Sequence, residues 1–327
     1  MARVREAVRQ SLAELPRGTT VLVACSGGAD SLALAAATAF EAPKLGLTAG
    51  AVVVDHNLQE GSTDIARKAA EQCHSLGLNP VQQVQVEVSG PGGPEAAARS
   101  ARYGALTRAA EELGADVILL AHTRDDQAET VLLGLARGSG SRSLAGMAPI
   151  SGPLRRPLLE VSRSTTVAAC LASGLTPWHD PHNDDPAYTR VRVRHEVLPV
   201  LTEALGPGVI EALARTASLV RADADALDAL AAELTATAVR RTSLDSGMEV
   251  QIEIGALESE HLALRSRVLR QAAIEAGCRP TDLSAGHIAA VDELITGWRG
   301  QRWIDLPQGL RAVRRAGAIV IGRGVTG

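Results

Sequence analysis

Aromatic residues are nearly absent from this chain of 327 residues, since three Trp, two Tyr and one Phe make up only 2% of it. A protein that binds single-stranded nucleic acid by stacking bases on aromatic side chains needs more of them, so that class is excluded. Lysine is also scarce, because only Lys44 and Lys68 accompany the arginines among the 33 basic residues. Any nucleic acid here is therefore held mainly by charge and shape, and arginine suits phosphate contacts through its planar fork.

Cysteine and long apolar runs are scarce as well. No C-x-x-C pair or Cys/His cluster occurs, which argues against structural zinc, iron–sulfur clusters and disulfide frameworks. The longest nearly apolar run, residues 32–40, is about half the length that a membrane span needs. Residues 4–15 have the pattern of an amphipathic helix and not of a signal peptide. These absences predict a cytoplasmic protein without a membrane partner. The four scattered cysteines are Cys25, Cys73, Cys170 and Cys278.

The net charge of −4 averages over an uneven distribution. Residues 137–195 hold eight arginines against four acids, and the last thirty residues hold six arginines against Asp305 alone. Residues 223–260 hold nine acids against two arginines. The uneven pattern predicts two basic surfaces on a chain that is acidic as a whole.

The first half of the chain alternates short apolar runs with longer helical patterns, which is typical of a parallel sheet covered by helices. We predict an α/β fold with a Rossmann-like parallel sheet and helices on both faces. The run at residues 116–121 is almost wholly apolar, as a strand buried on both faces should be. The expected strands are residues 20–25, 50–55, 81–88 and 116–121, and the expected helices are residues 31–40, 63–76, 95–113 and 127–136.

The second half is expected to form a smaller, mostly helical α+β domain. Residues 138–157 are rich in Gly, Ser and Pro and are predicted to form a loop. We place the domain boundary near Leu205, so that residues 1–204 form the first domain and residues 205–327 a helical linker and second domain. Further expected helices are residues 162–173, 190–205, 207–241, 257–276 and 285–295, and expected strands are residues 301–306 and 318–321.

The sharpest motif is Cys-Ser-Gly-Gly-Ala-Asp-Ser at residues 25–31, where the first strand gives way to the first helix. Backbone N–H groups at two glycines, together with serine hydroxyls at a helix N-terminus, form a cradle for an anion. Asp30 inside such a cradle points to Mg²⁺ bound with phosphates. The alternative is an ordinary strand-to-helix turn with a serine cap. The predicted phosphate-binding residues are Ser26, Gly27, Gly28, Ala29, Asp30 and Ser31.

Two further motifs are weaker when taken alone. Asp55 and His56 end the second strand, where side chains of parallel sheets face the ligand crevice, although Asp55 could simply cap the next turn. Glu95, Arg99 and Arg102 share one helical face, which also fits an ordinary surface ion pair. Arg102 is the candidate for a substrate contact.

A histidine and three acids follow the fourth strand. His122, Asp125, Asp126 and Glu129 lie at the mouth of the crevice that is predicted to hold Asp30. The acids could instead only favour the positive end of a helix, which accounts for one or two of them more easily than for three. A later run of basic residues could be a solvated face or a phosphate-binding surface: Arg190, Arg192, Arg194 and His195.

These motifs together resemble the PP-loop ATPases, which cleave ATP between the α and β phosphates. V-D-H-x-L at residues 54–58, E-A-A-A-R-S-A-R-Y at 95–103 and L-A-H-T-R-D-D-Q-A-E-T at 120–130 narrow the resemblance to the tRNA(Ile)-lysidine synthetase family. The likeness covers residues 15–205. Thr123 replaces a histidine of the family pattern, and Val191 replaces an asparagine.

The resemblance implies a reaction and its partners. AMP from ATP is transferred to the C2 oxygen of the wobble cytidine in the CAU anticodon of tRNA(Ile), and free L-lysine then displaces AMP. The product, lysidine, changes AUG decoding to AUA and methionine identity to isoleucine. The implied first domain is a PP-loop (adenine nucleotide alpha hydrolase-like) catalytic domain, and the second binds tRNA.

Residue roles follow from the same resemblance and from what these groups can do. Asp30 and Asp126 are expected to hold Mg²⁺, and the glycine turn with Asp55 and His56 to hold ATP. Arg102, Asp126 and Glu129 are expected to bind lysine. The expected catalytic residues are Asp30, Arg102, His122, Asp126 and Glu129, and the expected tRNA contacts are Arg190, Arg192, Arg194, Arg311, Arg314 and Arg315.

Other functions stay open at the level of sequence. A cytidine thiolase on the same fold would need a reactive cysteine or a cluster, and the cysteines here are scattered. A small-molecule amidotransferase or synthetase would leave the basic segments unexplained. A tRNA-binding or nucleotide-sensing protein without turnover would have no use for Asp30, Asp126 and Glu129. The oligomeric state is not fixed by the sequence, and a homodimer is one option.

Overall fold

A computed structural model describes residues 1–55, 61–86, 94–138, 140–244 and 247–325, with the side chains of residues 94–96 left out. Within these ranges the chain divides into two compact units, residues 1–221 and residues 222–327. The sequence placed the division near Leu205. Helix α10 (Val209–Ala238) runs without a break through the point of division, and the Arg221 guanidinium donates to the carbonyl oxygens of Ala145 and Gly146, which ties the first part of α10 to the first unit.

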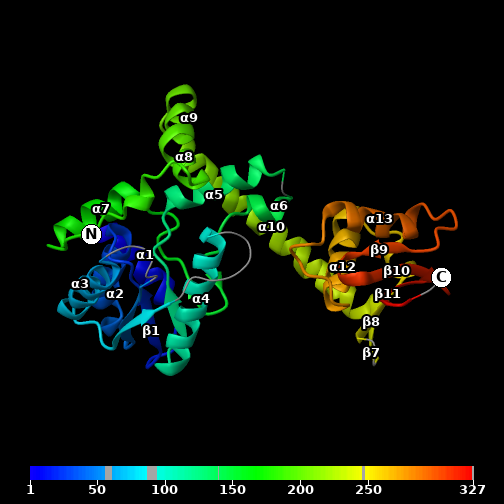
Figure 1. Ribbon diagram of the computed structural model, residues 1–327, viewed down its shortest axis with the longest axis horizontal. Coiled ribbons are helices and arrows are strands. Elements are labelled where there is room, and N and C mark those ends of the chain that lie inside the picture. Colours follow the sequence, from blue (N-terminus) through cyan, green and yellow to red (C-terminus); the bar gives the residue numbers. More distant parts are fainter. Residues whose placement is uncertain (56–60, 87–93, 139, 245–246, 326–327) are drawn as a thin grey trace. The chain divides into compact units, whose positions relative to one another are not determined.

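The first unit is built on a six-stranded sheet with the order β3-β2-β1-β4-β6-β5. Figure 1 labels β1 of this sheet among the helices α1, α2, α3 and α4. All neighbours are parallel except β5 and β6, which form a short antiparallel hairpin at one edge. This hairpin lies in the segment that was predicted to be a loop. The strands are β1 (Thr20–Ala24), β2 (Thr48–Asp55), β3 (Val81–Gln85), β4 (Val117–Leu119), β5 (Ile150–Ser151) and β6 (Leu154–Arg155).

Helices cover both faces of this sheet, as the sequence predicted. Val21 and Val23 of β1 face a core shared with α1, α2, α3 and α7, whereas Leu22 and Ala24 face a second core under α4. This alternation follows from the two-residue period of a strand. The helices are α1 (Ala2–Leu12), α2 (Ala29–Glu41), α3 (Ser62–Ser75), α4 (Pro94–Glu112), α5 (Arg124–Ala136), α6 (Ser141–Leu144) and α7 (Arg163–Ala172).

Beyond α7, the first unit continues with α8 (Thr189–Arg192), a π-helical turn (Val193–Val197) and α9 (Leu198–Leu205). No single helix of the described chain is long and apolar enough to cross a membrane, although the bent pair Thr189–Leu205 and Val209–Ala238 would pass together by length and composition.

The second unit contains a five-stranded antiparallel sheet with the order β7-β8-β11-β10-β9. Its core lies between one face of this sheet and the helices α12 and α13. The sequence missed β7, β8 and β10. An Ala-rich helical pattern that was extended to residue 241 accounts for the omission of β7. The elements are β7 (Val239–Leu244), β8 (Gly247–Glu253), α11 (Ile254–Leu257), α12 (Leu262–Glu275), α13 (Ala285–Thr296), β9 (Ile304–Leu306), β10 (Leu310–Arg315) and β11 (Ala318–Arg323).

Candidate active site

A cavity of about 510 Å³ opens where β1 and β4 end. The chain leaves β1 toward β2 on one side and returns to β4 on the other, and ligands of open α/β sheets bind at such a switch point. The glycine loop (residues 25–31) and the segment after β4 both line this cavity, so the two motifs meet as predicted at Asp30, His122 and Asp126, whereas Asp125 and Glu129 are not part of the lining. Lining residues from them include Ser26, Gly28, Asp30, Ser31, His122 and Asp126.

The glycine loop has the backbone that an anion cradle requires. Gly27 has a φ of 80°, in the left-handed region that favours glycine, and a Cβ there would lie 3.2 Å from the Cβ of Ala69. Gly28 is the N-cap of α2, and no side chain caps its N-terminus. The Ser31 hydroxyl donates to the Gly28 carbonyl oxygen at 2.9 Å and accepts from the Ser26 amide at 3.2 Å. Ser31 therefore holds the shape of the loop, whereas Ser26 is exposed at its surface.

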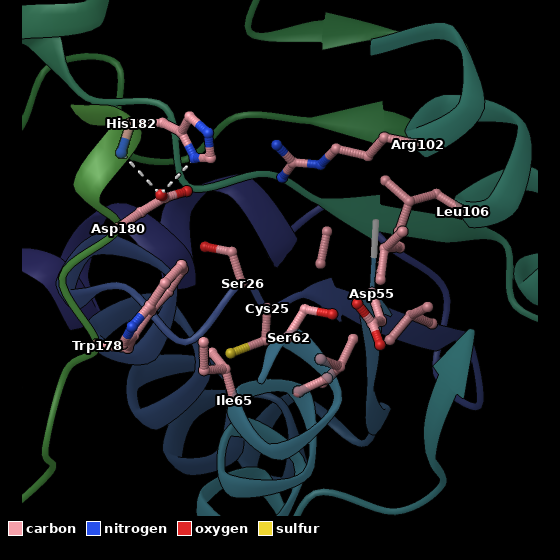
Figure 2. A pocket seen from close by; sticks show the side chains of 15 residues that line it. Cys25, Ser26, Asp55, Ser62, Ile65, Arg102, Leu106, Trp178, Asp180 and His182 are labelled. Atoms are coloured by element: carbon pink, nitrogen blue, oxygen red, sulfur yellow. Dashed lines mark hydrogen bonds and ion pairs between the residues drawn. The ribbon is translucent and has the colours of Figure 1, made fainter. Parts of the chain in front are cut away.

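A second cavity, of about 130 Å³, lies at the ends of β1 and β2 and shares Ser26, Arg102 and Trp178 with the first. Most of its lining is apolar and includes Val52, Ile65 and Leu106. Figure 2 shows Ser26 and Arg102 pointing into it, with Trp178 and Asp180 on the side opposite Leu106. The Trp178 amide donates to the Gly27 carbonyl oxygen at 2.9 Å, which ties this segment to the glycine loop.

Arg102 reaches both cavities from α4. Among the described residues, none forms a hydrogen bond or ion pair with its guanidinium, although Arg99 on the same helix contacts the Tyr103 ring. A guanidinium that is largely removed from water needs an anionic partner. The arrangement therefore points to an anionic group of a ligand, a phosphate or a carboxylate, at this position.

Asp30 lies at the start of α2 with its side chain 28% exposed. Its Oδ1 accepts a hydrogen bond from the Thr166 hydroxyl of α7, and its Oδ2 is 3.9 Å from Nε of Arg163. Burial raises the pKa of Asp30 to about 6, against the lowering effect of the Thr166 hydrogen bond. This carboxylate is therefore partly protonated in mildly acidic solution, and it ionises more readily when a cation binds beside it.

Thr123 occupies the position at which the family pattern has a histidine, and it caps α5. The Thr123 amide and hydroxyl both donate to Oδ2 of Asp126, at 2.7 and 2.8 Å. Although burial opposes ionisation, Arg163 and these hydrogen bonds lower the pKa of Asp126. One oxygen of Asp126 is thus committed to the cap, and the other, Oδ1, accepts from Nη2 of Arg163 at 2.7 Å and lies 3.5 Å from Nη2 of Arg194.

His122 precedes this cap and lines the cavity. Burial lowers the pKa of its imidazole to about 3, so the ring is neutral at physiological pH. Its Nδ1 is buried, and no described residue forms a hydrogen bond with it. A neutral imidazole can offer one donor and one acceptor to a ligand, but it carries no positive charge for a phosphate.

Glu129 lies one turn further along α5, and its side chain has no exposed surface. Arg194 donates from Nε to Oε1 at 2.8 Å and from Nη2 to Oε2 at 3.2 Å. Arg163 reaches Oε1 at 3.2 Å, and Nη1 of Arg190 lies 3.6 Å from Oε2. Glu129 is absent from the linings of both cavities, so it organises arginines behind the cavity wall.

The arginines of residues 137–195 do not form a single solvated surface. This corrects the prediction, made from the charge pattern, that the segment is a basic surface. Of its eight arginines only Arg137 and Arg142 are exposed. Arg156 is buried and donates to the Ala148 carbonyl oxygen at 2.7 Å. Arg192 donates to the carbonyl oxygens of Pro186 and Ala187. The arginines face inward because carboxylates and carbonyl groups of the fold attract them.

The sequence also predicted two site residues at the end of the second strand, Asp55 and His56. Asp55 lines the second cavity and accepts a hydrogen bond from the Thr63 hydroxyl at 3.0 Å. His56 lies outside the described residues. Sequence reasoning missed Arg163 and Thr166, whose only signal was a serine cap, Ser162, at the start of a helical pattern.

The carboxylates of this site fit a magnesium ion that arrives with phosphates. Mg²⁺ prefers oxygen ligands and is usually bound by one or two carboxylates together with substrate phosphates. Asp30 and Asp126 line the same cavity beside the glycine loop. Among the described residues no group of three or more His, Cys, Asp or Glu side chains is arranged to hold a metal ion.

Two family models match the chain. One, described as a PP-loop domain, matches residues 2–201, and the other, described as a TilS substrate binding domain, matches residues 253–320. The first matched range contains every residue that lines the two cavities.

Curated relatives are similar over nearly the whole chain. A tRNA(Ile)-lysidine synthase of Thermobifida fusca (strain YX) is 55% identical over 322 residues, covering 98% of this chain and 97% of the relative. The enzyme of the same name from Salinispora tropica is 57% identical, with 98% and 95% covered. That from Streptomyces coelicolor is 56% identical, with 95% and 87% covered.

A solved structure shares the fold. The U34-tRNA thiolase NcsA from Methanococcus maripaludis, with its [4Fe-4S] cluster, superposes with a TM-score of 0.57 at 19% sequence identity. The match covers 67% of this chain and 79% of the thiolase. At this identity the likeness bears on the fold alone.

Proposed function

This chain belongs to the tRNA(Ile)-lysidine synthase family, and we propose that it uses ATP to join free L-lysine to C2 of the wobble cytidine in the CAU anticodon of tRNA(Ile). The observation that carries this proposal is the meeting of the glycine loop, Arg102 and Asp126 in one cavity at the switch point of the sheet. The match to a PP-loop domain supports the use of ATP, and the high identity to tRNA(Ile)-lysidine synthases supports tRNA(Ile) as the substrate.

The reaction needs two steps at one site. The C2 oxygen of cytidine is a poor leaving group, so it first attacks the α-phosphorus of ATP, which transfers AMP to it and releases pyrophosphate. The ε-amine of lysine then attacks C2 and expels AMP. Only the neutral amine is nucleophilic, so lysine must lose a proton before or during the attack.

We assign the phosphates to the glycine loop and the nucleoside to the smaller cavity. The uncapped N-terminus of α2 offers backbone N–H groups and the positive end of the helix dipole to an anion. Val52, Ile65 and Leu106 give the adjoining cavity the apolar lining that suits a nucleobase. A magnesium ion held between Asp30, Asp126 and the phosphates would offset the negative charge that develops on the leaving pyrophosphate.

Lysine binding is assigned to the same cavity. Arg102 has no anionic partner among the described residues, so it is available for the α-phosphate or for the lysine carboxylate. Asp126 offers Oδ1 to the ammonium group. Glu129 has both oxygens paired with arginines, so its contribution to lysine binding is to hold Arg163 and Arg194 in place. His122, neutral and exposed to the cavity, can exchange a hydrogen bond with substrate.

Replacing Gly27 by alanine should weaken ATP binding. The left-handed backbone at this position costs about 1 kcal/mol with any Cβ, and the new methyl group would press on Ala69 and shift the loop. We expect the KM for ATP to rise about tenfold, which corresponds to about 1.4 kcal/mol. Gly18→Ala is the matched control, because its φ of 86° carries the same strain and nothing lies within 4 Å of the new Cβ. Equal KM values for the two variants would contradict the assignment.

We propose that residues 205–327, the second domain of the sequence analysis, bind the body of the tRNA. Arg311 lies over the Trp303 ring at 4.4 Å and pairs with Asp305 at 3.1 Å. Arg314 lies over the Trp298 ring at 5.0 Å and donates to the Leu294 carbonyl oxygen. Both of these arginines are partly used within the fold, whereas Arg315, at the end of β10, is exposed.

Arg315→Ala should therefore weaken tRNA binding and its dependence on salt. Loss of one phosphate contact lowers the slope of log K against log salt by about 0.9. The check is a filter-binding or anisotropy titration with full-length protein at several salt concentrations. Arg240→Ala removes the same charge from the same unit, but Arg240 is paired with Glu253 at 2.8 Å and should leave the slope unchanged. The same change of slope in both variants would indicate a general charge effect instead of a contact.

The proposed function is tested by incubating the full chain with labelled lysine, ATP and a transcript that carries the CAU anticodon. Label should become bound to tRNA only when ATP is present, and exchange of pyrophosphate into ATP should require the tRNA. An unlabelled tRNA without any exchange would reject the enzyme and leave a binding protein. Cys25, Cys73 and Cys170 are buried in one core of the first unit and Cys278 in the core of the second. Among the described residues they form no group of three or more metal-ligating side chains, so sulfur transfer through a cluster finds no support in them.

A further inference from the structure

Arg163 is the cation held by three acids that we call the acidic cluster, namely Asp30, Asp126 and Glu129. Its Nη2 donates to Oδ1 of Asp126 at 2.7 Å and to Oε1 of Glu129 at 3.2 Å. Its Nε lies 3.9 Å from Oδ2 of Asp30. The side chain is 24% exposed and lines the larger cavity. One guanidinium thus reaches all three carboxylates.

The position of Arg163 is fixed through its backbone. It is the first residue of α7, and its amide donates to Oδ2 of Asp125 at 2.8 Å. Ser162 caps the same helix through the Thr165 amide, and the Thr166 hydroxyl donates to Asp30. These contacts tie α7 to α5 and α2 without the Arg163 side chain. A substitution of that side chain therefore leaves the anchors of the helix in place.

The charges make Arg163 a competitor of any other cation at this site. Oδ2 of Asp126 is used by the Thr123 cap, so a metal ion would bind Oδ1. Arg163 holds this oxygen at 2.7 Å, and Nη2 of Arg194 lies farther from it, at 3.5 Å. A divalent ion on Asp30 and Asp126 would lie close to the guanidinium, and like charges repel strongly where water is largely excluded. An arriving triphosphate changes this balance, because its oxygens can bind both the ion and the guanidinium.

We propose that Arg163 determines which cations the acidic cluster accepts, by competing with a divalent ion for Asp126 until a triphosphate offers the guanidinium another partner. The proposal rests on the metal site assigned to Asp30 and Asp126 under the proposed function. Such competition makes binding of the ion and binding of ATP cooperative, since each ligand makes the free energy of binding of the other more favourable. A divalent ion alone, or a free amine alone, binds weakly while Arg163 stays in place.

The test is to measure Mn²⁺ binding to the full chain by electron paramagnetic resonance, with and without a non-hydrolysable ATP analogue. The wild-type protein should bind Mn²⁺ weakly alone and more tightly with the analogue. Arg163→Met removes the charge and keeps much of the side-chain length. It should bind Mn²⁺ alone about tenfold more tightly, a change of the size expected for one lost repulsive contact, and the analogue should add less to the affinity.

Two variants serve as controls. Arg163→Lys keeps a positive charge beside Asp126 and should bind Mn²⁺ as weakly as the wild type. Arg67→Met removes an arginine that pairs with Asp64 and Glu71 on the surface of α3, and it should change nothing. The proposal is overturned if Arg163→Met and the wild type have the same Mn²⁺ affinity and the same increase of that affinity with the analogue. This outcome counts when Asp30→Asn, introduced into each of the two proteins, abolishes Mn²⁺ binding.

A measurement on the wild-type protein does not depend on the folding of a variant. Phenylglyoxal modifies exposed guanidinium groups, and mass spectrometry locates the modified residue. Mn²⁺ with the ATP analogue should change the modification rate of Arg163 relative to Arg67, because its partner changes, and an unchanged rate would contradict displacement. If Asp30→Asn binds Mn²⁺ and the analogue as well as the wild type does, the metal site assigned to Asp30 and Asp126 is wrong, and the proposal for Arg163 falls with it. Lysine transfer to the tRNA, measured separately, still decides the proposed function.

Discussion

Replacing Asp30 with alanine should abolish lysine incorporation while tRNA binding stays nearly intact. Asp30 lies in the glycine loop and lines the cavity that the phosphates are proposed to occupy, whereas the proposed tRNA surface is carried by the second unit. Loss of one group that stabilises transition-state charge typically costs about 10²–10³ in rate. The measurement combines single-turnover lysine transfer with a tRNA-binding titration on the same preparation.

Asp64→Ala is a matched control for this experiment. Asp64 also lies in the first turn of a helix, α3, but its side chain is exposed and paired with Arg67. The control removes the same charge at a comparable position of another helix and should leave transfer unchanged. Equal loss of transfer and of tRNA binding in Asp30→Ala would refute the division of labour between the glycine loop and the tRNA surface.

The sheet and its ligand crevice were predictable because local patterns and the fold agree there. The apolar run at residues 20–25 and the almost wholly apolar run at 116–121 became the neighbouring strands β1 and β4. Side chains that follow such strands meet at one edge of a parallel sheet, so Asp30 and Asp126 could be placed together from order alone. The motif of Asp126 also has the cap that a helix requires, since Thr123 caps the N-terminus of α5, whereas no side chain caps α2.

Strands of the second unit were harder to predict, although one of them carried a signal. In β8, Met248, Val250 and Ile252 alternate with polar residues, which is the period of a strand with one buried face. An Ala-rich helix precedes this segment, and helical periodicity was extended over β7 because its Arg240 and Arg241 fit a helix surface equally well. The antiparallel pairing of β7 with β8 decides the matter, and that pairing is a non-local interaction.

The direction of arginine side chains could not be predicted from the sequence. A count of charges assigns Arg190 and Arg194 to a basic surface, because exposed arginines are the common case. In the structure a single buried carboxylate, Glu129, draws them inward together with Arg163. Net charge along a segment therefore gives no information on which charges are neutralised by distant acids. Glu129 lies tens of residues away in sequence, and only the packing of α5 against α7 and the π-helical turn brings the partners together.

The acidic cluster also explains how a site that must bind cations avoids instability. Carboxylates that line a partly dry cavity repel one another, and burial, together with the charges of Asp126 and Asp125, raises the pKa of Asp30 to about 6. Arg163 and Arg194 line the cavity and contact Asp126 and Glu129, and Arg163 together with the hydrogen bonds of Thr123 lowers the pKa of Asp126 against the effect of burial. The site thus keeps one ionised carboxylate and one that is easily ionised, an arrangement that suits exchange between a metal ion, an ammonium group and a proton.

Replacing Glu129 with glutamine should destabilise the first unit, which makes it the largest structural effect expected of a single substitution in the site. Gln keeps the size of the side chain but leaves three arginine contacts without their counter-charge. Breaking a buried ion pair by removing one partner costs about 3–5 kcal/mol, and the partial exposure of the arginines favours about 3 kcal/mol here. Thermal unfolding of the full chain should therefore show a Tm lowered by roughly 2–4 °C for each kcal/mol in a unit of this size.

The matched control for this prediction is Glu71→Gln, because Glu71 also pairs with an arginine, at 2.6 Å, but on the exposed surface of α3. A surface pair contributes about 0–1 kcal/mol, so this variant should unfold almost as the wild type does. The comparison decides between two roles of Glu129. If Glu129→Gln retains the wild-type Tm and raises only the KM for lysine, then Glu129 binds the substrate ammonium directly. If the Tm falls in Glu129→Gln and falls by a similar amount in Arg194→Met, then the role of Glu129 is to support the arginines, since each variant removes one side of the same buried pair.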